Sequence, residues 1–217
     1  MLKIKSNLGE YMSGLFITME GTDGSGKSTQ LQLLQQYLTD KGFNVVLVRE
    51  PGGTRISEKI RTIILSKKNR DMNYMTEALL YAASRAQLVN QVILPELKKG
   101  SVVICDRFVD SSIVYQGIAR ELGIDVVKKI NNIATGGLTP DITFFLDLDL
   151  KSSLKRKKEQ KELDRIESEN AGFHKKVYEG YKKLSQDDGG RIKVIDATKS
   201  IQQIHKNIVK HLEKLFF

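Results

Sequence analysis

Two features that would place a chain in a membrane or in an oxidising compartment are missing from this sequence. Its single cysteine, Cys105, excludes any disulfide within the chain and fits a reducing compartment. No apolar run approaches the about 20 residues that a membrane-spanning helix needs. The lysine-containing residues 1–14 show neither an apolar core nor a cleavage signal, so they do not resemble a secretory peptide. We therefore expect a cytoplasmic protein without a membrane partner.

Basic residues are in excess: 35 Lys and Arg against 26 Asp and Glu leave a formal charge of +9. This surplus suits a nucleic-acid-binding protein, but it also suits an enzyme that holds two polyanionic nucleotides at once. The length of 217 residues fits one α/β domain, and 40% hydrophobic with 28% charged residues is typical of a globular protein. Composition alone does not separate the two classes.

Short apolar runs alternate with helical patterns along the chain. The expected strands are 15–20, 45–48, 101–105, 142–146 and 192–195, and the expected helices are 28–41, 57–65, 75–97, 125–134, 151–161, 169–185 and 201–215. Such alternation predicts an α/β fold, a doubly wound sheet of about five parallel strands with helices on both faces. We expect residues 1–13 to be a polar N-terminal extension and residues 14–217 to form one domain.

A glycine-rich stretch lies between the first expected strand and the first expected helix. Gly21–Ser28 matches the pattern G-x-x-x-x-G-K-[ST], and this context is the one in which the pattern forms a P-loop. Glycines let successive N–H groups point at phosphate oxygens, and the helix adds its positive end. Lys27 would reach the β and γ phosphates, and Ser28 would bind Mg²⁺. The expected ATP-binding residues are Gly21, Thr22, Asp23, Gly24, Ser25, Gly26, Lys27, Ser28 and Thr29.

A P-loop indicates a bound nucleotide but does not define the reaction. The Asn-Lys-x-Asp motif of GTPases is missing from the sequence, and Asp-x-x-Gly occurs only at 23–26, inside the glycine-rich stretch, and at 187–190, before the last expected strand, neither of which is the place of a GTPase switch. A regulatory P-loop protein that binds nucleic acid would use the positive charge and show strongly salt-dependent DNA binding. We regard that class as the less favoured alternative and expect no nucleic acid as a partner.

Four further motifs occur in order between Gly14 and the C-terminus. They are Arg49–Thr54 (REPGGT), Leu79–Arg85 (LLYAASR), Asp106–Phe108 followed by Ser111, Ser112 and Tyr115–Gly117, and Leu163–Glu167 (LDRIE). Together they resemble the thymidylate kinase family, in the bacterial form that has glycine at position 24 and arginine in the lid. The resemblance implies phosphoryl transfer from ATP to dTMP with Mg²⁺, a helical lid near 151–169 and a homodimer. Another nucleoside-monophosphate or deoxynucleoside kinase remains the alternative enzyme.

Two of these motifs have a direct physical interpretation. Tyr81 and Arg85 are four residues apart and share one face of a helix, so the ring can stack on a base while the guanidinium donates to an exocyclic oxygen. Taken alone, Tyr81 would be interpreted as a core aromatic. Arg107 directly follows an expected strand and therefore lies at the carboxyl edge, where parallel sheets bind ligands. A structural ion pair is the alternative for Arg107.

The resemblance extends these assignments to the whole acceptor site. It implies that Arg107 contacts the acceptor phosphate, that Asp106 lies near the metal and that Asp23 reaches the sugar 3′-hydroxyl, although Asp23 could instead face solvent. Tyr115 would crowd the 2′ position and so disfavour ribose. The expected dTMP-binding residues are Asp23, Arg49, Arg61, Tyr81, Arg85, Arg107, Ser112, Tyr115 and Gln116, and the expected metal-binding residues are Ser28 and Asp106.

The expected catalytic residues are Lys27, Arg107 and Arg165. A phosphate monoester with a second pKa near ~6 is already anionic at neutral pH, so a general base is not required. A nucleoside acceptor would need a general base for its hydroxyl, and Glu50 is a candidate for that base. A nucleoside therefore remains an alternative acceptor. In the lid, Arg165 is expected to stabilise the transferring phosphoryl group, since its planar fork suits phosphate better than the surrounding lysines. Arg156 is its rival.

Overall fold

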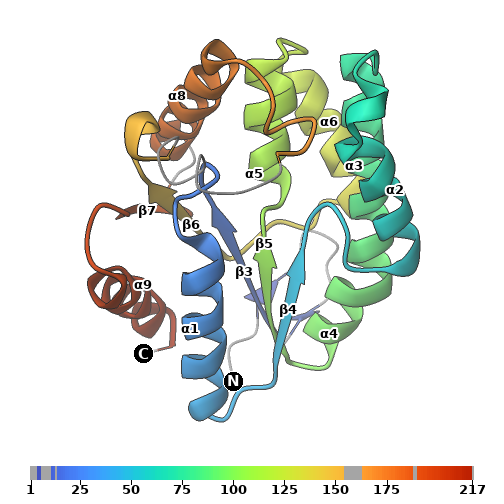
Figure 1. Ribbon diagram of the computed structural model, residues 1–217. Coiled ribbons are helices and arrows are strands. Elements are labelled where there is room, and N and C mark those ends of the chain that lie inside the picture. The colour runs from blue at the N-terminus through green and yellow to red at the C-terminus, as the bar shows by residue number, and fades with distance from the viewer. Residues whose placement is uncertain (1–3, 6–10, 13, 154–162, 188–189, 217) are drawn as a thin grey trace.

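The computed structural model describes residues 4–5, 11–12, 14–153, 163–187 and 190–216. Its main sheet has the order β4-β5-β3-β6-β7, and every neighbouring pair is parallel (Figure 1). The predicted doubly wound α/β sheet is therefore confirmed. The strands, whose ends lie within one residue of those expected, are β3 (Leu15–Glu20), β4 (Val45–Arg49), β5 (Val102–Asp106), β6 (Ile142–Asp147) and β7 (Ile192–Asp196).

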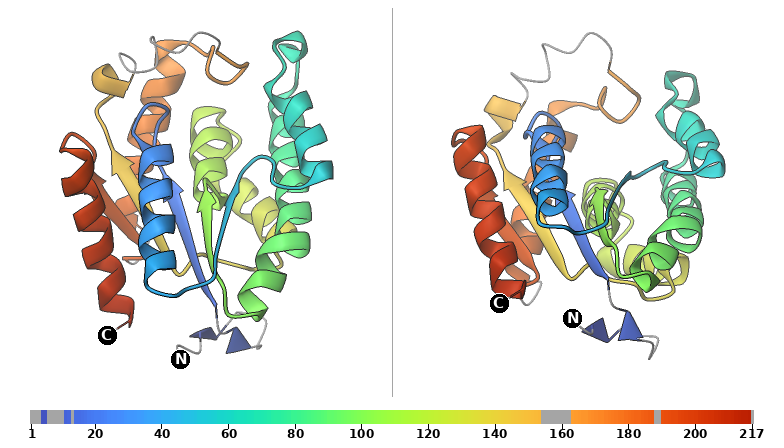
Figure 2. Two further views of the ribbon diagram at one scale, coloured as in Figure 1. Left: turned by 60° about the horizontal axis from the view of Figure 1, so that its bottom comes forward. Right: turned by 90° about the horizontal axis from the view of Figure 1, so that it is seen from below.

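Helices cover both faces of this sheet, as Figures 1 and 2 show. One face carries α1 (Lys27–Asp40) and α9 (Ile201–Phe216). The helices of the other face and of the edge beside it are α2 (Arg55–Leu65), α3 (Tyr74–Leu88), α4 (Leu94–Lys98), α5 (Val109–Ser112), α6 (Ile124–Thr135) and α8 (Ala171–Asp187), with the short helical segments η1 (Lys67–Asn69), η2 (Val89–Ile93) and η3 (Ile113–Ala119). The two faces enclose separate apolar cores.

The central strand β3 contributes to both cores because its side chains alternate between the faces. Ile17 and Met19 are fully buried against α1 and α9. Phe16 points to the opposite face, where its ring meets that of Phe108 edge to face at 4.9 Å. At the carboxyl ends, Met19 and Arg49 both align with Asp106, so β3, β4 and β5 end at the same level. The residues that follow these strands are thereby brought together.

Two segments differ from the sequence predictions. The single helix expected at 75–97 contains a π-helical turn, η2, because Pro95 lacks an N–H and its ring would clash with the preceding turn of a regular helix. The helical stretch 109–119 was not predicted. Its side chains are mostly buried on all sides, so it shows no amphipathic period.

The structure describes parts of the predicted N-terminal extension and of the expected lid. In the extension, β1 (Ile4–Lys5) pairs antiparallel with β2 (Tyr11–Met12) and forms a small sheet separate from the main one (Figure 2). In the expected lid, residues 150–153 are helical and residues 165–168 form a turn. The part of the lid at 154–162 lies outside the described residues.

Candidate active site

The glycine-rich stretch forms a loop between β3 and α1. Gly24 and Gly26 have φ angles of 80° and 97°, and a Cβ at Gly26 would meet nothing within 4 Å, so the backbone angle rather than space requires glycine there. Lys27 Nζ donates to the carbonyl oxygens of Gly21 and Thr22, both at 3.1 Å. Burial, followed by the nearby charge of Arg107, lowers the pKa of Lys27.

Arg107 directly follows β5 and faces the glycine-rich loop. Its φ of 67° is uncommon for a residue other than glycine. Its guanidinium donates to Asp23 Oδ1 at 2.6 Å and to the Tyr181 hydroxyl at 3.1 Å, and it lies 5.4 Å from the centre of the Tyr115 ring. The ion pair considered from the sequence therefore exists, and it joins the loop to the end of β5.

A buried carboxylate at the end of β3 supports this arginine. Glu20 accepts from the backbone N–H of Phe108 at 2.7 Å, from Ser111 Oγ at 2.5 Å and from the Tyr181 hydroxyl at 2.8 Å. Ser111 and Tyr181 also accept hydrogen bonds from Arg107, at 3.4 and 3.1 Å. Burial raises the pKa of Glu20, and the hydrogen bonds oppose that shift. Glu20 thus holds both the backbone after Arg107 and two partners of its side chain.

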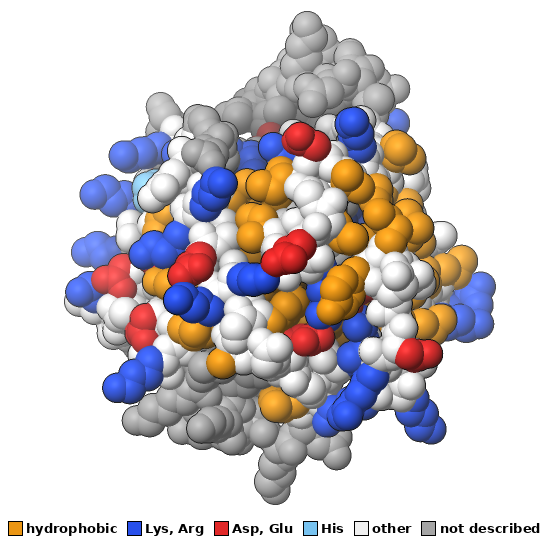
Figure 3. All heavy atoms as spheres, turned by 90° about the horizontal axis from the view of Figure 1, so that it is seen from above, with side chains coloured by type: hydrophobic (Ala, Val, Ile, Leu, Met, Phe, Trp, Pro, Cys, Tyr) orange, Lys and Arg blue, Asp and Glu red, His pale blue; other side chains and the backbone are white. Residues whose placement is uncertain are grey.

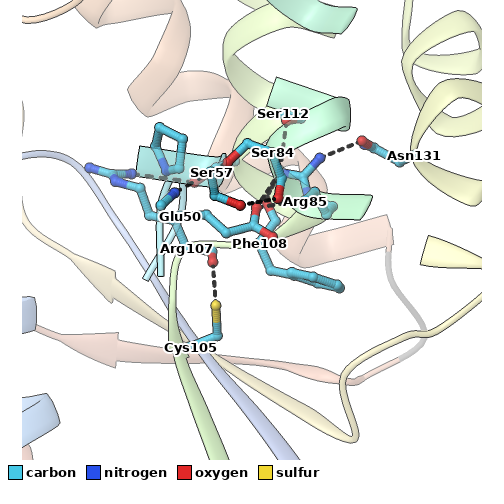
Figure 4. A network of polar contacts seen from close by, with 12 residues as sticks. Glu50, Ser57, Ser84, Arg85, Cys105, Arg107, Phe108, Ser112 and Asn131 are labelled. Atoms are coloured by element: carbon cyan, nitrogen blue, oxygen red, sulfur yellow. Dashed lines mark hydrogen bonds and ion pairs between the residues drawn. The ribbon is translucent and has the colours of Figure 1, made fainter. Parts of the chain in front are cut away.

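A second arginine, Arg85 of α3, lies in a network on the other side of the site (Figure 4). Its guanidinium donates to Glu50 Oε2 at 2.8 Å, Asn131 Oδ1 at 2.5 Å, the Phe108 carbonyl at 3.2 Å and Ser112 Oγ at 3.1 Å. Arg85 and Glu50 have side chains only 1% and 3% exposed. Burial raises the pKa of Glu50 to about 7, although Arg85 acts in the opposite direction. The network leaves one N–H on Nη1 of Arg85 without an acceptor among these partners.

Two further arginines converge on the loop after β4. Arg49 and Arg61 each donate through Nη1 to the Pro51 carbonyl, at 2.8 and 2.9 Å. Arg49 also pairs with Glu58 at 2.9 Å, and both of these side chains are 45% exposed. Burial, followed by the charge of Arg49, lowers the pKa of Arg61. Arg49 therefore marks the rim of the site, and Arg61 lies deeper.

These elements surround one cavity of about 420 Å³, within the range of small-molecule sites. Of the residues predicted for ATP, those that line it are Asp23, Gly24, Gly26, Lys27, Ser28 and Thr29, whereas Gly21, Thr22 and Ser25 are not among its lining residues. The predicted acceptor residues all line it: Asp23, Arg49, Arg61, Tyr81, Arg85, Arg107, Ser112, Tyr115 and Gln116. Ser28 and Asp106, predicted for the metal, line it too.

Comparison with known proteins identifies this arrangement. The family model described as thymidylate kinase matches residues 19–208. The thymidylate kinase of Caldanaerobacter subterraneus subsp. tengcongensis is 50% identical over 203 residues, which cover 94% of this chain and 97% of the relative. That of Thermoanaerobacter sp. strain X514 is 48% identical, with 94% and 99% covered. The chain belongs to the thymidylate kinase family. The crystal structure of the Ehrlichia chaffeensis thymidylate kinase superposes with a TM-score of 0.75 at 33% identity, covering 92% of this chain and 98% of that one.

The family resemblance read from the motifs is thus confirmed, and with it the function. The chain is a thymidylate kinase that phosphorylates dTMP to dTDP with ATP. Within the described part of the kinase, no helix is long and apolar enough to cross a membrane.

The structure differs from the sequence prediction for Arg165 of the kinase. Although Asp164, Ile166 and Glu167 line the cavity, Arg165 does not. Its guanidinium lies 2.8 Å from Glu77 Oε2 and donates to the Ile64 carbonyl at 2.7 Å, and its side chain is 5% exposed. The reason is that the fully buried carboxylate of Glu77 needs cationic partners. Arg156, its rival, lies outside the described residues.

Proposed function

We propose that the kinase holds ATP and dTMP together in this cavity, with the donor on the glycine-rich loop and the acceptor between α3, β5 and η3. The observation that carries the proposal is that loop residues 23–24 and 26–29 line the same cavity as the acceptor residues. The start of α1 favours the donor phosphates through its free N–H groups and dipole. When the donor enters, Lys27 would exchange its two carbonyl acceptors for phosphate oxygens.

The acceptor base would lie along α3. Tyr81 and Arg85 share a face of this helix and both line the cavity, so the Tyr81 ring offers a stacking surface. Ser112 and Gln116, on α5 and η3, line the cavity beside α3 and can read the polar edge of the pyrimidine. Tyr115 is buried between Phe173 and Tyr181 and would exclude a 2′-hydroxyl by its fixed position.

The acceptor phosphate would lie between Arg107, Arg49 and Arg61. The carboxylate of Asp23 does not prevent this, because Arg107 pairs with it at 2.6 Å and offsets its charge. Asp23 is then placed to accept from the sugar 3′-hydroxyl. Alignment and charge neutralisation carry the transfer, since the attacking phosphate oxygen is already anionic. A nucleoside acceptor would need Glu50 as a base. This carboxylate is paired with Arg85 and lies in the cavity wall, and thymidine in the acceptor assay tests that alternative.

The residues present also fit a magnesium ion. Asp106 Oδ1 is buried and has no hydrogen-bond partner among the described residues, and Asp106 and Ser28 line the same cavity. Magnesium prefers oxygen ligands and is bound by one or two carboxylates together with substrate phosphates. Ser28 and Asp106 would hold it, and the ion would neutralise charge on the phosphates. The described residues contain no group of three or more His, Cys, Asp or Glu side chains that could hold a metal ion. A magnesium ion bound by one carboxylate, a hydroxyl and substrate phosphates does not need such a group.

An assay of ADP release across acceptors tests this placement. We expect dTMP to be the best acceptor, ahead of dUMP, with UMP and thymidine poor. The missing methyl group of dUMP should cost on the order of 1 kcal/mol, and UMP would meet Tyr115. If AMP, CMP or a nucleoside exceeded dTMP, the acceptor side of the cavity would be wrongly assigned.

Two wider proposals concern the surface of the kinase. A homodimer is supported by large exposed apolar side chains on α2, α3 and α6, namely Ile56, Ile63, Leu79, Val126 and Ile133. Ile133, 83% exposed, is the most accessible of them. Substitution Ile133→Lys should yield monomers in light scattering if this surface joins two copies.

On the face in Figure 3, basic side chains are interspersed with acidic ones, which does not favour a nucleic-acid groove there. A cytoplasmic location remains part of the proposal, in line with the single cysteine.

A further inference from the structure

Glu77 is a buried carboxylate beneath the proposed base site, and the proposed chemistry does not use it directly. It lies in the first turn of α3 and is 0% exposed. Its Oε1 accepts from Gln116 Nε2 at 3.0 Å and from Arg120 Nε at 3.3 Å. Its Oε2 accepts from Arg120 Nη2 at 3.2 Å and lies 2.8 Å from Arg165 Nη2. Glu77 therefore links Gln116 of the proposed base site to Arg165 in the expected lid.

The contact with Gln116 fixes which end of its amide faces the cavity. A carboxylate paired with two guanidinium groups only accepts hydrogen bonds, so it must face the NH₂ end of Gln116. The opposite end, Oε1, is then held as an acceptor, and nothing among the described residues donates to it. Because Gln116 is 1% exposed and lines the cavity, its amide has one orientation and one free acceptor.

We propose that Glu77 is a specificity-determining positioning residue, which locks the Gln116 amide so that only a pyrimidine carrying hydrogen on N3 is accepted. Thymine and uracil donate from N3, whereas cytosine presents a lone pair there and would face the Gln116 oxygen. Two acceptor atoms that face each other in a buried site, with no hydrogen between them, discriminate strongly against cytosine. This inference rests on the proposed placement of the acceptor base.

The substitution Glu77→Gln tests the proposal because it inverts the amide. A glutamine has one oxygen, and two guanidinium groups compete for it at the Oε2 position. Its NH₂ group is then turned toward Gln116, whose own NH₂ must face the cavity. Calorimetry with dTMP and dCMP in the absence of ATP should show the dissociation constant for dTMP rising about tenfold. That for dCMP should not rise. An equal weakening of both nucleotides would overturn the proposal, because it would indicate a purely structural role.

A double-mutant cycle shows whether the effect passes through Gln116. Gln116→Leu should also weaken dTMP about tenfold, and the double variant should bind no more weakly than either single one. Additive losses of about a hundredfold would overturn the proposal. Unchanged dTMP affinity in Gln116→Leu would contradict the proposed placement of the base itself. If dTMP affinity fell in Gln116→Leu but not in Glu77→Gln, only the proposed role of Glu77 would be wrong. Glu121→Gln, at a surface pair with Lys176, is the matched control.

A measurement on the unmodified kinase keeps the test valid if Glu77→Gln does not fold. The side-chain NH₂ resonances of Gln116 can be identified by their loss in Gln116→Leu. They should exchange with solvent much more slowly than those of the exposed Gln32 before any nucleotide is added. Exchange as fast as that of Gln32 would overturn the proposal, because the amide would not be held by Glu77.

Discussion

Arg107 and Asp23 form an ion pair of 2.6 Å between the end of β5 and the glycine-rich loop. Arg107 is expected to bind the acceptor phosphate, and Asp23 belongs to the loop expected to bind the donor and also to reach the acceptor's 3′-hydroxyl, so the pair connects the acceptor phosphate to the donor loop. Replacing Arg107 by lysine keeps the charge but removes the fork that reaches Asp23 and Tyr181 together. We expect kcat/KM for dTMP to fall about 10²-fold in steady-state assays. Arg70→Lys, at an exposed arginine that does not line the cavity, is the matched control, and an equal loss there would contradict a special role for Arg107.

Lys27 should separate donor chemistry from acceptor binding. Among the described residues its ammonium donates hydrogen bonds only to loop carbonyls, and the acceptor residues other than Asp23 come from other segments. Lys27→Ala should lower turnover at least about 10²-fold, while calorimetry finds dTMP affinity nearly unchanged. Lys41→Ala, at the exposed end of the same helix, should behave as the unmodified enzyme. Loss of dTMP affinity together with turnover would show that the two sites are not separable.

Glu50 should make the stability of the kinase depend on pH. Burial raises its pKa from 4.5 to about 7, so between these values the folded protein binds more protons than the unfolded chain. Its contribution to stability is therefore present below pH 4.5 and is lost as the pH rises through 7. In urea unfolding, the free energy of unfolding of the unmodified protein should fall by about 3 kcal/mol relative to that of Glu50→Gln over this pH range. A difference that does not vary with pH would mean that Arg85 keeps Glu50 ionised throughout.

The strands and the glycine-rich loop could be predicted because each depends on a local pattern. The residues expected to bind the acceptor came from the family resemblance, and the structure brings them to one cavity. The buried carboxylates could not be predicted. Glu20 contacts the backbone of Phe108, 88 positions away, and Glu77 contacts Gln116, 39 positions away. Glu77 also occupies the first turn of α3, where an acidic residue is commonly interpreted as a solvated partner of the helix dipole. Pairing across such distances depends on the packing of the whole sheet, which no local spacing records.

The contacts of Arg165 in the expected lid could not be predicted from local sequence either. From the sequence, Arg165 is the lid residue whose planar fork suits the transferring phosphoryl group. In the structure its neighbours Asp164 and Ile166 line the cavity, while Arg165 itself turns to Glu77 and to the end of α2. Its backbone N–H also donates to the Leu65 carbonyl at 3.0 Å. Arg165 is therefore placed to anchor the lid rather than to contact phosphate.

We expect Arg165→Ala to act mainly on stability. Breaking a buried ion pair costs about 3–5 kcal/mol, and the remaining pair of Glu77 with Arg120 at 3.2 Å should place the loss near the lower end. Urea unfolding measures this loss. Well below the unfolding temperature, the variant should keep more than roughly a tenth of its turnover, which is more than loss of a catalytic arginine would leave. Arg156→Ala should do the reverse, reducing kcat with little change in stability or in KM for dTMP. If Arg165→Ala instead lost about 10³-fold in kcat at unchanged stability, Arg165 would have to leave Glu77 during turnover and close over the phosphoryl group.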